Sequence, residues 1–405
     1  MTPTCRHCRA PLTLEFLDLG HAPPSNAYLT PADLSAPEIT YPLRLRACPH
    51  CRLVQTEDFA SADTLFAEDY AYFSSTSQSW LAHAARYVDM ITARLGLNPQ
   101  SQVIEVASND GYLLKNFVAK GIPCLGIEPT KGTADAARTL GIPVQQSFFG
   151  EKTASRLDRA DLIIGNNVYA HVPDINDFTL GLRLALKPRG VITLEFPHLM
   201  RLVQSNQFDT VYHEHFSYLS LLSVEAIMHR AGLRVFDVEE LTTHGGSLRT
   251  YACHADADQA ELPALAALRA TESAQGLGDD AYYTAFQSSA EQVKNDFLRF
   301  LLTAKAEDKS VAAYGAAAKG NTLLNFAGVG PDLLPFVCDA APSKIGRFLP
   351  GSHIPILAPD VLRQNRPDYL IIFPWNIADE IRARNADLAA LGTRFVTTVP
   401  DLRVD

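Results

Sequence analysis

Positive charge is scarce in this sequence. Its 405 residues carry 35 Lys and Arg against 45 Asp and Glu, which gives a formal net charge of −10. No stretch gathers lysine and arginine into a basic stripe. Nucleic acids and anionic membranes are bound mainly through such basic side chains. We therefore expect neither nucleic acid nor membrane as a partner.

Long apolar runs are missing as well. The opening residues, MTPTCRHCRA, contain no apolar signal core, and no uninterrupted apolar run approaches the roughly 18 residues of a spanning helix. We therefore expect a cytoplasmic protein. Disulfide frameworks are rare in that reducing compartment, so the spacing of the seven cysteines is better analysed for a metal site.

Four of these cysteines form two CxxC pairs, CRHC at Cys5 and Cys8 and CPHC at Cys48 and Cys51. Each such turn directs two thiolates at one point, and two turns supply the four ligands of a closed tetrahedral zinc site. A closed site has no position left for substrate, so we predict structural zinc in a domain of residues 1–68. The alternative is two unrelated pairs of reduced cysteines.

The middle of the chain has the pattern of a wound parallel sheet. From 103 to 197, strand-like runs such as VIEVAS and PCLGIE alternate with helical runs such as GYLLKNFVAK. Two further runs, RVFDVEEL and SLRTYACH, flank the turn-rich TTHGG and predict an antiparallel hairpin. This arrangement is typical of Rossmann-like class I methyltransferases that use S-adenosylmethionine. The predicted fold class is therefore α/β, with this core at 69–255.

A second α/β unit follows a helical connection. Residues 255 to 307 are rich in Ala, Leu and charge, and SVAAYGAAAKGNTLLNFAGV then reads as strand, small-residue turn and helix. That order is typical of nucleotide-binding units. We predict a helical connection and a C-terminal Rossmann-like domain at 256–405.

The first strand and turn of the core predict the cofactor. The segment VIEVASNDGYLL lacks the GxGxxG of a dinucleotide site, and Glu105 before the turn suits a cationic cofactor better than a pyrophosphate. Glu128, which ends the next strand, would receive the two ribose hydroxyls of an adenosine. The alternative is a plain Rossmann-like core with a surface glutamate.

Ligands of open α/β sheets bind at the carboxyl ends of the strands. The segment GNNVYAHVPD ends another predicted strand, so we add its two asparagines to the predicted cofactor site. The predicted S-adenosylmethionine site comprises Glu105, Ala107, Ser108, Asn109, Gly111, Tyr112, Glu128, Asn166 and Asn167.

Four proton-handling groups stand side by side in VYHEHFSY, namely Tyr212, His213, Glu214 and His215. A helix would place Tyr212 and His215 on one face, whereas a strand would pair Tyr212 with Glu214. The sequence leaves both geometries open. A metal on the two histidines would need a separate carboxylate, and nothing in the sequence singles one out. A third reading is a strand whose histidines are simply hydrogen-bonded.

Taken together, several segments resemble the sugar C-methyltransferases that branch nucleotide-linked deoxysugars in antibiotic and surface-polysaccharide pathways. The resemblance runs from residue 5 to beyond 340 and rests on CRHC, CPHC, EDYAYFSSTS, EVASNDGYLL, NNVYAHV, YHEHFSYLS, THGGSLR and YGAAAKGNTLLN. It implies zinc-binding, methyltransferase and Rossmann-like domains, with a sugar nucleotide held in the cleft between them. It also implies methyl transfer to a ring carbon, commonly carbon 3, of a dTDP-linked 4-keto-deoxysugar.

This chemistry needs a base, because a ring carbon becomes nucleophilic only after a proton beside the ketone is removed. By resemblance, His215 is the base, and Tyr212 and Glu214 orient the substrate or support the enolate. His171 is an accessory acid or hydrogen-bond donor, and His213 is structural. Alternatives are a sugar N- or O-methyltransferase and, in another class, a non-catalytic zinc-containing scaffold. The presence of both Glu105 and Glu128 argues against the scaffold.

The substrate contacts come from both ends of the chain. Lys319 lies at a predicted helix start, where backbone N–H groups and a cation can meet phosphate. The alternative is a C-terminal packing domain that binds nothing. The predicted substrate contacts are Tyr70, Tyr72, Ser75, Arg249, Lys319 and Asn321. We expect the enzyme to be a monomer.

Overall fold

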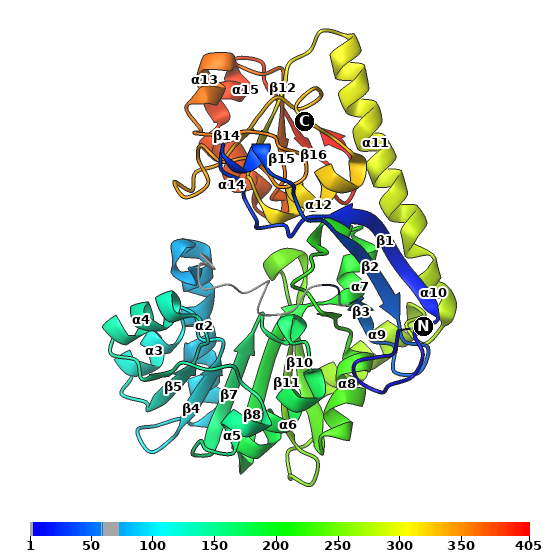
Figure 1. Cartoon of the computed structure of the whole chain (residues 1–405). Helices are drawn as coiled ribbons and strands as arrows, with labels where there is room; N and C mark the ends of the chain where they lie inside the picture. Colours follow the sequence, from blue (N-terminus) through cyan, green and yellow to red (C-terminus); the bar gives the residue numbers. More distant parts are fainter. Residues whose placement is uncertain (1–2, 58, 60–72) are drawn as a thin grey trace.

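The computed structural model describes residues 3–57, 59 and 73–405, so Tyr70 and Tyr72 lie outside the described residues. It contains a four-, a seven- and a six-stranded sheet, which are built mainly from the N-terminal, the central and the C-terminal part of the chain (Figure 1). In the described part of the chain, no helix is long and apolar enough to cross a membrane.

The seven-stranded central sheet has the order β10-β11-β8-β7-β4-β5-β6. Its parallel strands are β4 (Val103–Val106), β5 (Cys124–Ile127), β6 (Val144–Gln145), β7 (Ala160–Asn166) and β8 (Leu186–Pro197). β10 (Leu233–Leu241) and β11 (Ser247–His254) form the antiparallel hairpin. The predicted α/β core with its closing hairpin is confirmed.

Helices cover both faces of this sheet, which explains why β4 is buried along its whole length. The helices of this part of the chain are α2 (Gln78–Leu95), α3 (Leu114–Ala119), α4 (Lys131–Thr139), α5 (Glu151–Ala154), α6 (Ile175–Ala185), α7 (Leu199–Gln204) and α8 (Leu221–Arg230). The same part of the chain contains the short 3-10 turns η2 (Ser74–Thr76), η3 (Tyr169–His171), η4 (Phe208–Thr210) and η5 (Thr243–Gly245).

The N-terminal sheet is completed by a strand from the core. β1 (Leu14–Ala22), β2 (Tyr41–Ala47) and β3 (Val54–Thr56) form an antiparallel sheet, and η1 (Asp33–Ser35) lies between the first two. β9 (Ser217–Tyr218) then pairs with β3. The histidine-rich segment just before β9 is thereby attached to the zinc-binding region.

The C-terminal sheet has the order β14-β13-β12-β15-β16-β17 and is parallel except for β17, in agreement with the predicted Rossmann-like unit. Its strands are β12 (Val311–Tyr314), β13 (Val337–Cys338), β14 (Ile356–Leu357), β15 (Tyr369–Ile372), β16 (Arg394–Thr397) and β17 (Arg403–Val404). Its helices are α12 (Ala318–Ala327), α13 (Val361–Asn365), α14 (Ala378–Arg384) and α15 (Ala386–Ala390), with η6 (Trp375–Ile377).

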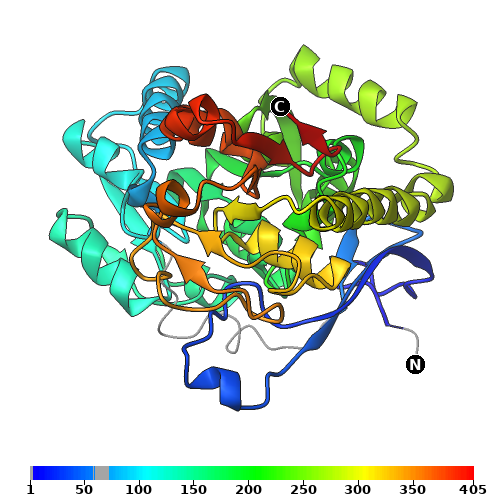
Figure 2. The same ribbon diagram turned by 90° about the horizontal axis from the view of Figure 1, so that it is seen from above.

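The predicted helical connection consists of α9 (Pro263–Ala274), α10 (Asp280–Thr284) and the long α11 (Phe286–Ala306), which runs along one side of the molecule (Figure 1). Seen from above, the C-terminal unit lies over the central sheet, with the N-terminal strands along one side (Figure 2).

Two hydrogen bonds fix α12 at the junction of the three units. The Thr322 hydroxyl donates to the carbonyl of Val211 at 2.9 Å, and the Asn321 side chain donates to the carbonyl of Ser25 at 2.6 Å. The segment that begins at Val211 and leads through the two histidines to β9 is therefore held between all three parts of the chain.

Candidate functional site

The two CxxC pairs come together as the sequence predicts. The four sulfur atoms all lie within 4.8 Å of one another, with Cys5 Sγ 3.5 Å from Cys51 Sγ and Cys8 Sγ 3.4 Å from Cys48 Sγ. Zn–S bonds of about 2.3 Å in a tetrahedron place the sulfurs about 3.8 Å apart, so the cluster fits zinc. All four ligands come from the protein, which makes the site structural.

The predicted cofactor acids lie on neighbouring strand ends. The Glu128 carboxylate accepts the N–H groups of Asn109 and Thr130, both at 2.9 Å. Glu105 is only 1% exposed, and burial, with repulsion from Glu128 and Asp110, raises its pKa well above the usual range. A cationic ligand beside Glu105 would relieve this repulsion.

The turn between β4 and α3 is shaped for close approach. Ala107, Asn109 and Gly111 all have left-handed backbone conformations, with φ of 56°, 50° and 78°. A Cβ on Gly111 would lie 2.4 Å from the side chain of Ile142, so that position requires glycine.

Unpaired polar atoms surround the same strand ends. Within the described residues, no hydrogen-bond partner is present for the buried oxygens Glu105 Oε2, Ser108 Oγ, Asn166 Oδ1 and Asn167 Oδ1. Buried polar atoms are normally hydrogen-bonded. Their grouping at the ends of β4 and β7 fits a polar ligand such as S-adenosylmethionine, with Tyr112 buried below the turn.

The histidine-rich segment forms a turn, neither helix nor strand. The His215 N–H donates to the Tyr212 carbonyl at 3.2 Å, which brings these two side chains to the same side. The ring of His215 lies 4.8 Å from Tyr212, 6.0 Å from Tyr218 and 4.5 Å from His171, measured between centroids. The turn thus joins predicted site residues from two separate loops.

Burial sets the protonation of this cluster. His171 Nδ1 donates to the Glu214 carbonyl at 3.0 Å, so Nε2 carries the lone pair. Burial lowers the pKa of His171 to about 4, and burial together with the nearby His171 lowers the pKa of His215 well below its usual value. Burial also raises the pKa of Tyr212. At neutral pH the imidazoles can accept protons and the phenol can donate a hydrogen bond.

Glu214 and His213 point to other partners. The Glu214 carboxylate accepts from the Asn26 amide at 3.0 Å, and burial raises its pKa. The His213 ring lies against Tyr41 at 5.9 Å. In the part of the chain that the structure describes, the four cysteines are the only group of three or more metal-ligating side chains. A metal on His213 and His215 therefore gains no support.

The sequence analysis did not identify His244 as a site residue. It lies in the turn between β10 and β11 with φ of 54°, 5.1 Å from the Trp80 ring. Burial lowers its pKa to about 4, with a further contribution from Lys319, and His244 in turn acts on the pKa of His215. The segment THGGSLR contains His244, but neither the predicted hairpin turn nor the family resemblance gave this residue a role.

Asp209 was also missed. It is 2% exposed, and its Oδ2 accepts from the Trp375 indole at 2.7 Å. Burial raises the pKa of Asp209 to about 6, which Lys319 partly opposes. A single aspartate in a polar segment gives no sequence signal of burial.

The predicted substrate residues differ in how accessible they are. Lys319 Nζ lies 4.0 Å over the Trp375 ring and donates to Asn376, and burial lowers its pKa to about 8. Ser75 is exposed and its N–H donates to Asp110 at 3.1 Å, which places it beside the cofactor turn.

Arg249 and Asn321 are buried and each bonds other protein groups. The Arg249 side chain is 3% exposed and forms ion pairs of 2.7 Å with both Glu195 and Glu239. Asn321 is 1% exposed and bonds Ser25. Arg249 thus ties together strands of the central sheet and Asn321 the domain junction, and the substrate contacts predicted for both stay predictions; among the described residues the buried Asn321 Oδ1 has no hydrogen-bond partner.

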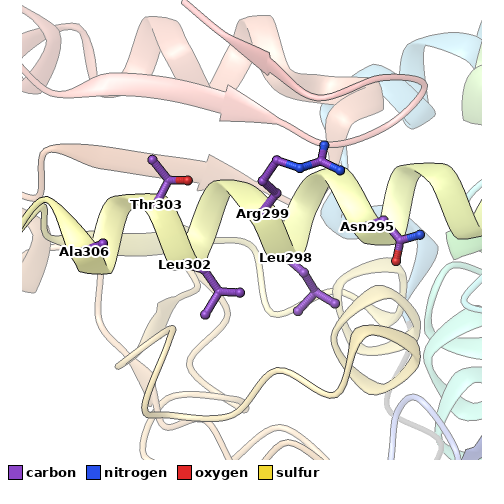
Figure 3. Close-up of a pocket in the computed structure, with 6 residues that line it drawn as sticks. All are labelled: Asn295, Leu298, Arg299, Leu302, Thr303 and Ala306. Atoms are coloured by element: carbon purple, nitrogen blue, oxygen red, sulfur yellow. The ribbon is translucent and has the colours of Figure 1, made fainter.

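A hollow of about 560 Å³ lies on α11, lined by Asn295, Leu298, Arg299, Leu302, Thr303 and Ala306 (Figure 3). None of the predicted site residues lines this hollow, so it is separate from the histidine cluster.

Comparison with known protein families assigns each part of the chain. A zinc binding domain matches residues 5–66, a methyltransferase domain matches 80–238 and a C-methyltransferase C-terminal domain matches 242–400. The C-methyltransferase NovU of Streptomyces niveus is 34% identical over 99% of this chain and 96% of its own length.

Solved structures are more distant. The magnesium protoporphyrin IX methyltransferase of Synechocystis PCC 6803 with bound SAM is 15% identical over 49% of this chain and 100% of its own, with a TM-score of 0.37. An S-adenosylmethionine-dependent methyltransferase of Clostridium acetobutylicum is 12% identical over 47% of this chain and 95% of its own, with a TM-score of 0.34. We draw no conclusion from likenesses this weak. The full-length match and the three domains show that the chain belongs to the C-methyltransferase family, as an S-adenosylmethionine-dependent enzyme with a structural zinc site.

Proposed function

We propose that the enzyme transfers a methyl group from S-adenosylmethionine to carbon 3 of a dTDP-linked 4-keto-deoxysugar. The observation that carries the proposal is the grouping of two neutral imidazoles and a protonated phenol, with His215 4.5 Å from His171 and 4.8 Å from Tyr212. A carbon acceptor needs such acid–base groups, whereas an amine or hydroxyl acceptor needs fewer.

In the proposed reaction, His215 takes the proton from carbon 3, next to the ketone. A hydrogen bond with the Thr210 backbone raises the pKa of His215, against the stronger effect of burial, and stabilises the imidazolium that forms. The electron pair left by the proton moves into the enolate, whose oxygen receives a hydrogen bond from Tyr212. When bound, S-adenosylmethionine would supply an electrophilic methyl group. The enolate carbon would form the new C–C bond as the S–CH3 bond breaks, and the electron pair of that bond would stay on sulfur, which leaves S-adenosylhomocysteine.

The remaining groups orient the substrate. Glu214, held by Asn26, forms a wall of the site, and its carbonyl accepts from His171 Nδ1, so that the Nε2 lone pair of His171 can accept a hydrogen bond from the substrate. We assign the diphosphate to Lys319, because its ammonium group lies at the start of α12 and faces the junction of the domains. Ser75 would contact the sugar, and Tyr70 and Tyr72, which lie outside the described residues, stay predicted sugar contacts.

A product screen tests this proposal. The enzyme is incubated with S-adenosylmethionine and a panel of nucleotide-linked 4-keto sugars that varies the base and the substituent at carbon 3, and NMR locates the new methyl group. We expect a methyl group on carbon 3 of dTDP-linked substrates. A methyl group on oxygen or nitrogen would overturn the proposed chemistry, and equal turnover of UDP-linked sugars would overturn the choice of nucleotide.

A further inference from the structure

The side chain of Arg6 joins the zinc site to both histidine-bearing loops. Its Nη1 donates to the Pro173 carbonyl at 2.9 Å, and its guanidinium lies 5.4 Å from the centre of the Phe216 ring. Pro173 follows His171 by two residues, and Phe216 directly follows His215. One buried side chain, 7% exposed, therefore contacts both segments that place the imidazoles.

The backbone of Arg6 is fixed by the metal-binding turn. Its N–H donates to Gln55 Oε1 at 2.8 Å, and the amide of the same glutamine donates to Cys5 Sγ at 3.3 Å. Gln55 also pairs with Ser217 where β3 meets β9. The position of Arg6 thus depends on the zinc-binding turn and on the strand that follows His215.

The first CxxC turn is also attached to the loop after His171. The Asn176 amide donates to the carbonyls of Arg6 at 3.1 Å and His7 at 3.0 Å, and its oxygen lies 2.8 Å from His7 Nδ1. Asn176 belongs to the first turn of α6, whose N-cap is Asp174. The loop from His171 to α6 is therefore held against the turn at several points.

We infer that Arg6 is a positioning residue, which transmits the rigidity of the zinc turn to His171 and His215 and so sets their separation. The catalytic roles of these histidines rest on the proposed function, whereas the contacts of Arg6 do not. A planar guanidinium can donate in two directions, here to Pro173 and to Thr56 at 3.1 Å, while its face covers an aromatic ring. A lysine ammonium cannot do all three.

The second zinc turn offers a matched control. Arg52, next to Cys51, forms an ion pair with Asp280 and lies 5.8 Å from the Tyr283 ring. Both partners belong to α10, and neither adjoins a histidine of the cluster. Loss of Arg52 removes a guanidinium from a zinc turn without touching the loops of His171 and His215.

The test compares Arg6→Met, Arg6→Lys and Arg52→Met by zinc content, S-adenosylmethionine affinity, methylation kinetics and NMR of the imidazole C–H groups. Signals are assigned with His171→Gln and His215→Gln. We expect Arg6→Met to keep one zinc and its cofactor affinity, to move the signals of both histidines, and to lose roughly 10- to 100-fold in kcat. Arg6→Lys should show a smaller change of the same kind, and Arg52→Met none.

Unmoved imidazole signals in the Arg6 variants would overturn the inference, as would equal movement in Arg52→Met. If Arg6→Met does not fold, the imidazole signals of Arg6→Lys test the inference instead. Loss of zinc or of the fold in both variants would overturn it, because Arg6 would then act in folding. The imidazole spectra need no sugar substrate. A failed product screen would therefore contradict the proposed function and leave this test intact.

Discussion

At the scale of single residues, the chemistry of the histidine cluster depends on its burial. His215 gains no carboxylate partner among the interactions that shape its pKa; desolvation and the neighbouring His171 both favour the neutral ring. A neutral imidazole is ready to accept a proton, although its conjugate acid is destabilised. The destabilised imidazolium is consistent with a base that passes its proton on quickly.

The pH profile should show this effect. Because the folded-state pKa of His215 is lowered, its neutral form persists below the ordinary value of about 6.5, and the acid limb of kcat/KM should lie below that pH. His171→Gln removes one of the causes that lower this pKa, so the limb should move to higher pH even though the maximum rate falls. A wild-type limb above pH 6.5 would contradict this account.

Glu128 should act on the cofactor alone. Glu128→Ala removes the acceptor that holds the Asn109 and Thr130 N–H groups and that we expect to bind the ribose. Calorimetry should show S-adenosylmethionine binding weakened by about 1–3 kcal/mol. The affinity for the sugar nucleotide should barely change, and an equal loss of both would show that Glu128 is structural.

At the scale of elements, local patterns predicted much of the fold. The alternation from 103 to 197 predicted the parallel strands, and TTHGG predicted the β10–β11 hairpin, because period and turn chemistry are local properties. The four-cysteine site was predictable for the same reason. The turn at Tyr212 was not predictable, because its four polar residues fit helix, strand and turn equally well. Only the packing of Val211 and β9 selects the turn.

Removal of one zinc ligand should affect a whole region. The two buried ligands Cys5 and Cys48 pack in the same apolar cluster as Leu12, Leu53 and Met200, so the zinc turns form part of the core. Cys48→Ser should give poorly soluble protein with little zinc rather than a folded, slow enzyme. Metal analysis and circular dichroism check this result. Wild-type protein purified without chelator that contained no zinc would contradict the assignment.

At the scale of the whole molecule, the site depends on contacts that are remote in sequence. Asp209 meets Trp375, Thr322 meets Val211, and Arg6 meets Pro173. No local pattern predicts these pairs, since each depends on how the three units pack. His171 and His215 were identified through motif resemblance, whereas the resemblance gave no role to His244.

The buried carboxylate at the domain junction has a cost in stability. The pKa of Asp209 is raised to about 6 from 3.8. The protonated carboxyl therefore stabilises the folded state fully below about pH 4, and this stabilisation, on the order of 3 kcal/mol, is lost as pH rises through 6. Asp209→Asn keeps an acceptor for Trp375. Calorimetry should find that this variant lacks the decline between pH 4 and 6 and is at least as stable as wild type at pH 8.

A loss of more than about 1 kcal/mol at pH 8 in Asp209→Asn would contradict that prediction. It would show that attraction to Lys319 outweighs the desolvation of the carboxylate. In that case the charged pair would stabilise the junction instead of weakening it.

The central claim is that His215 removes the proton from the ring carbon that receives the methyl group. Its most direct test is the rate of methyl transfer by His215→Ala in a single turnover, with the 4-keto sugar nucleotide and S-adenosylmethionine both bound. His213→Ala is the matched control, because that ring packs against Tyr41 outside the cluster. The account predicts a loss of roughly 10²- to 10⁴-fold for His215→Ala with both ligands still bound. A rate near that of the wild type would contradict it.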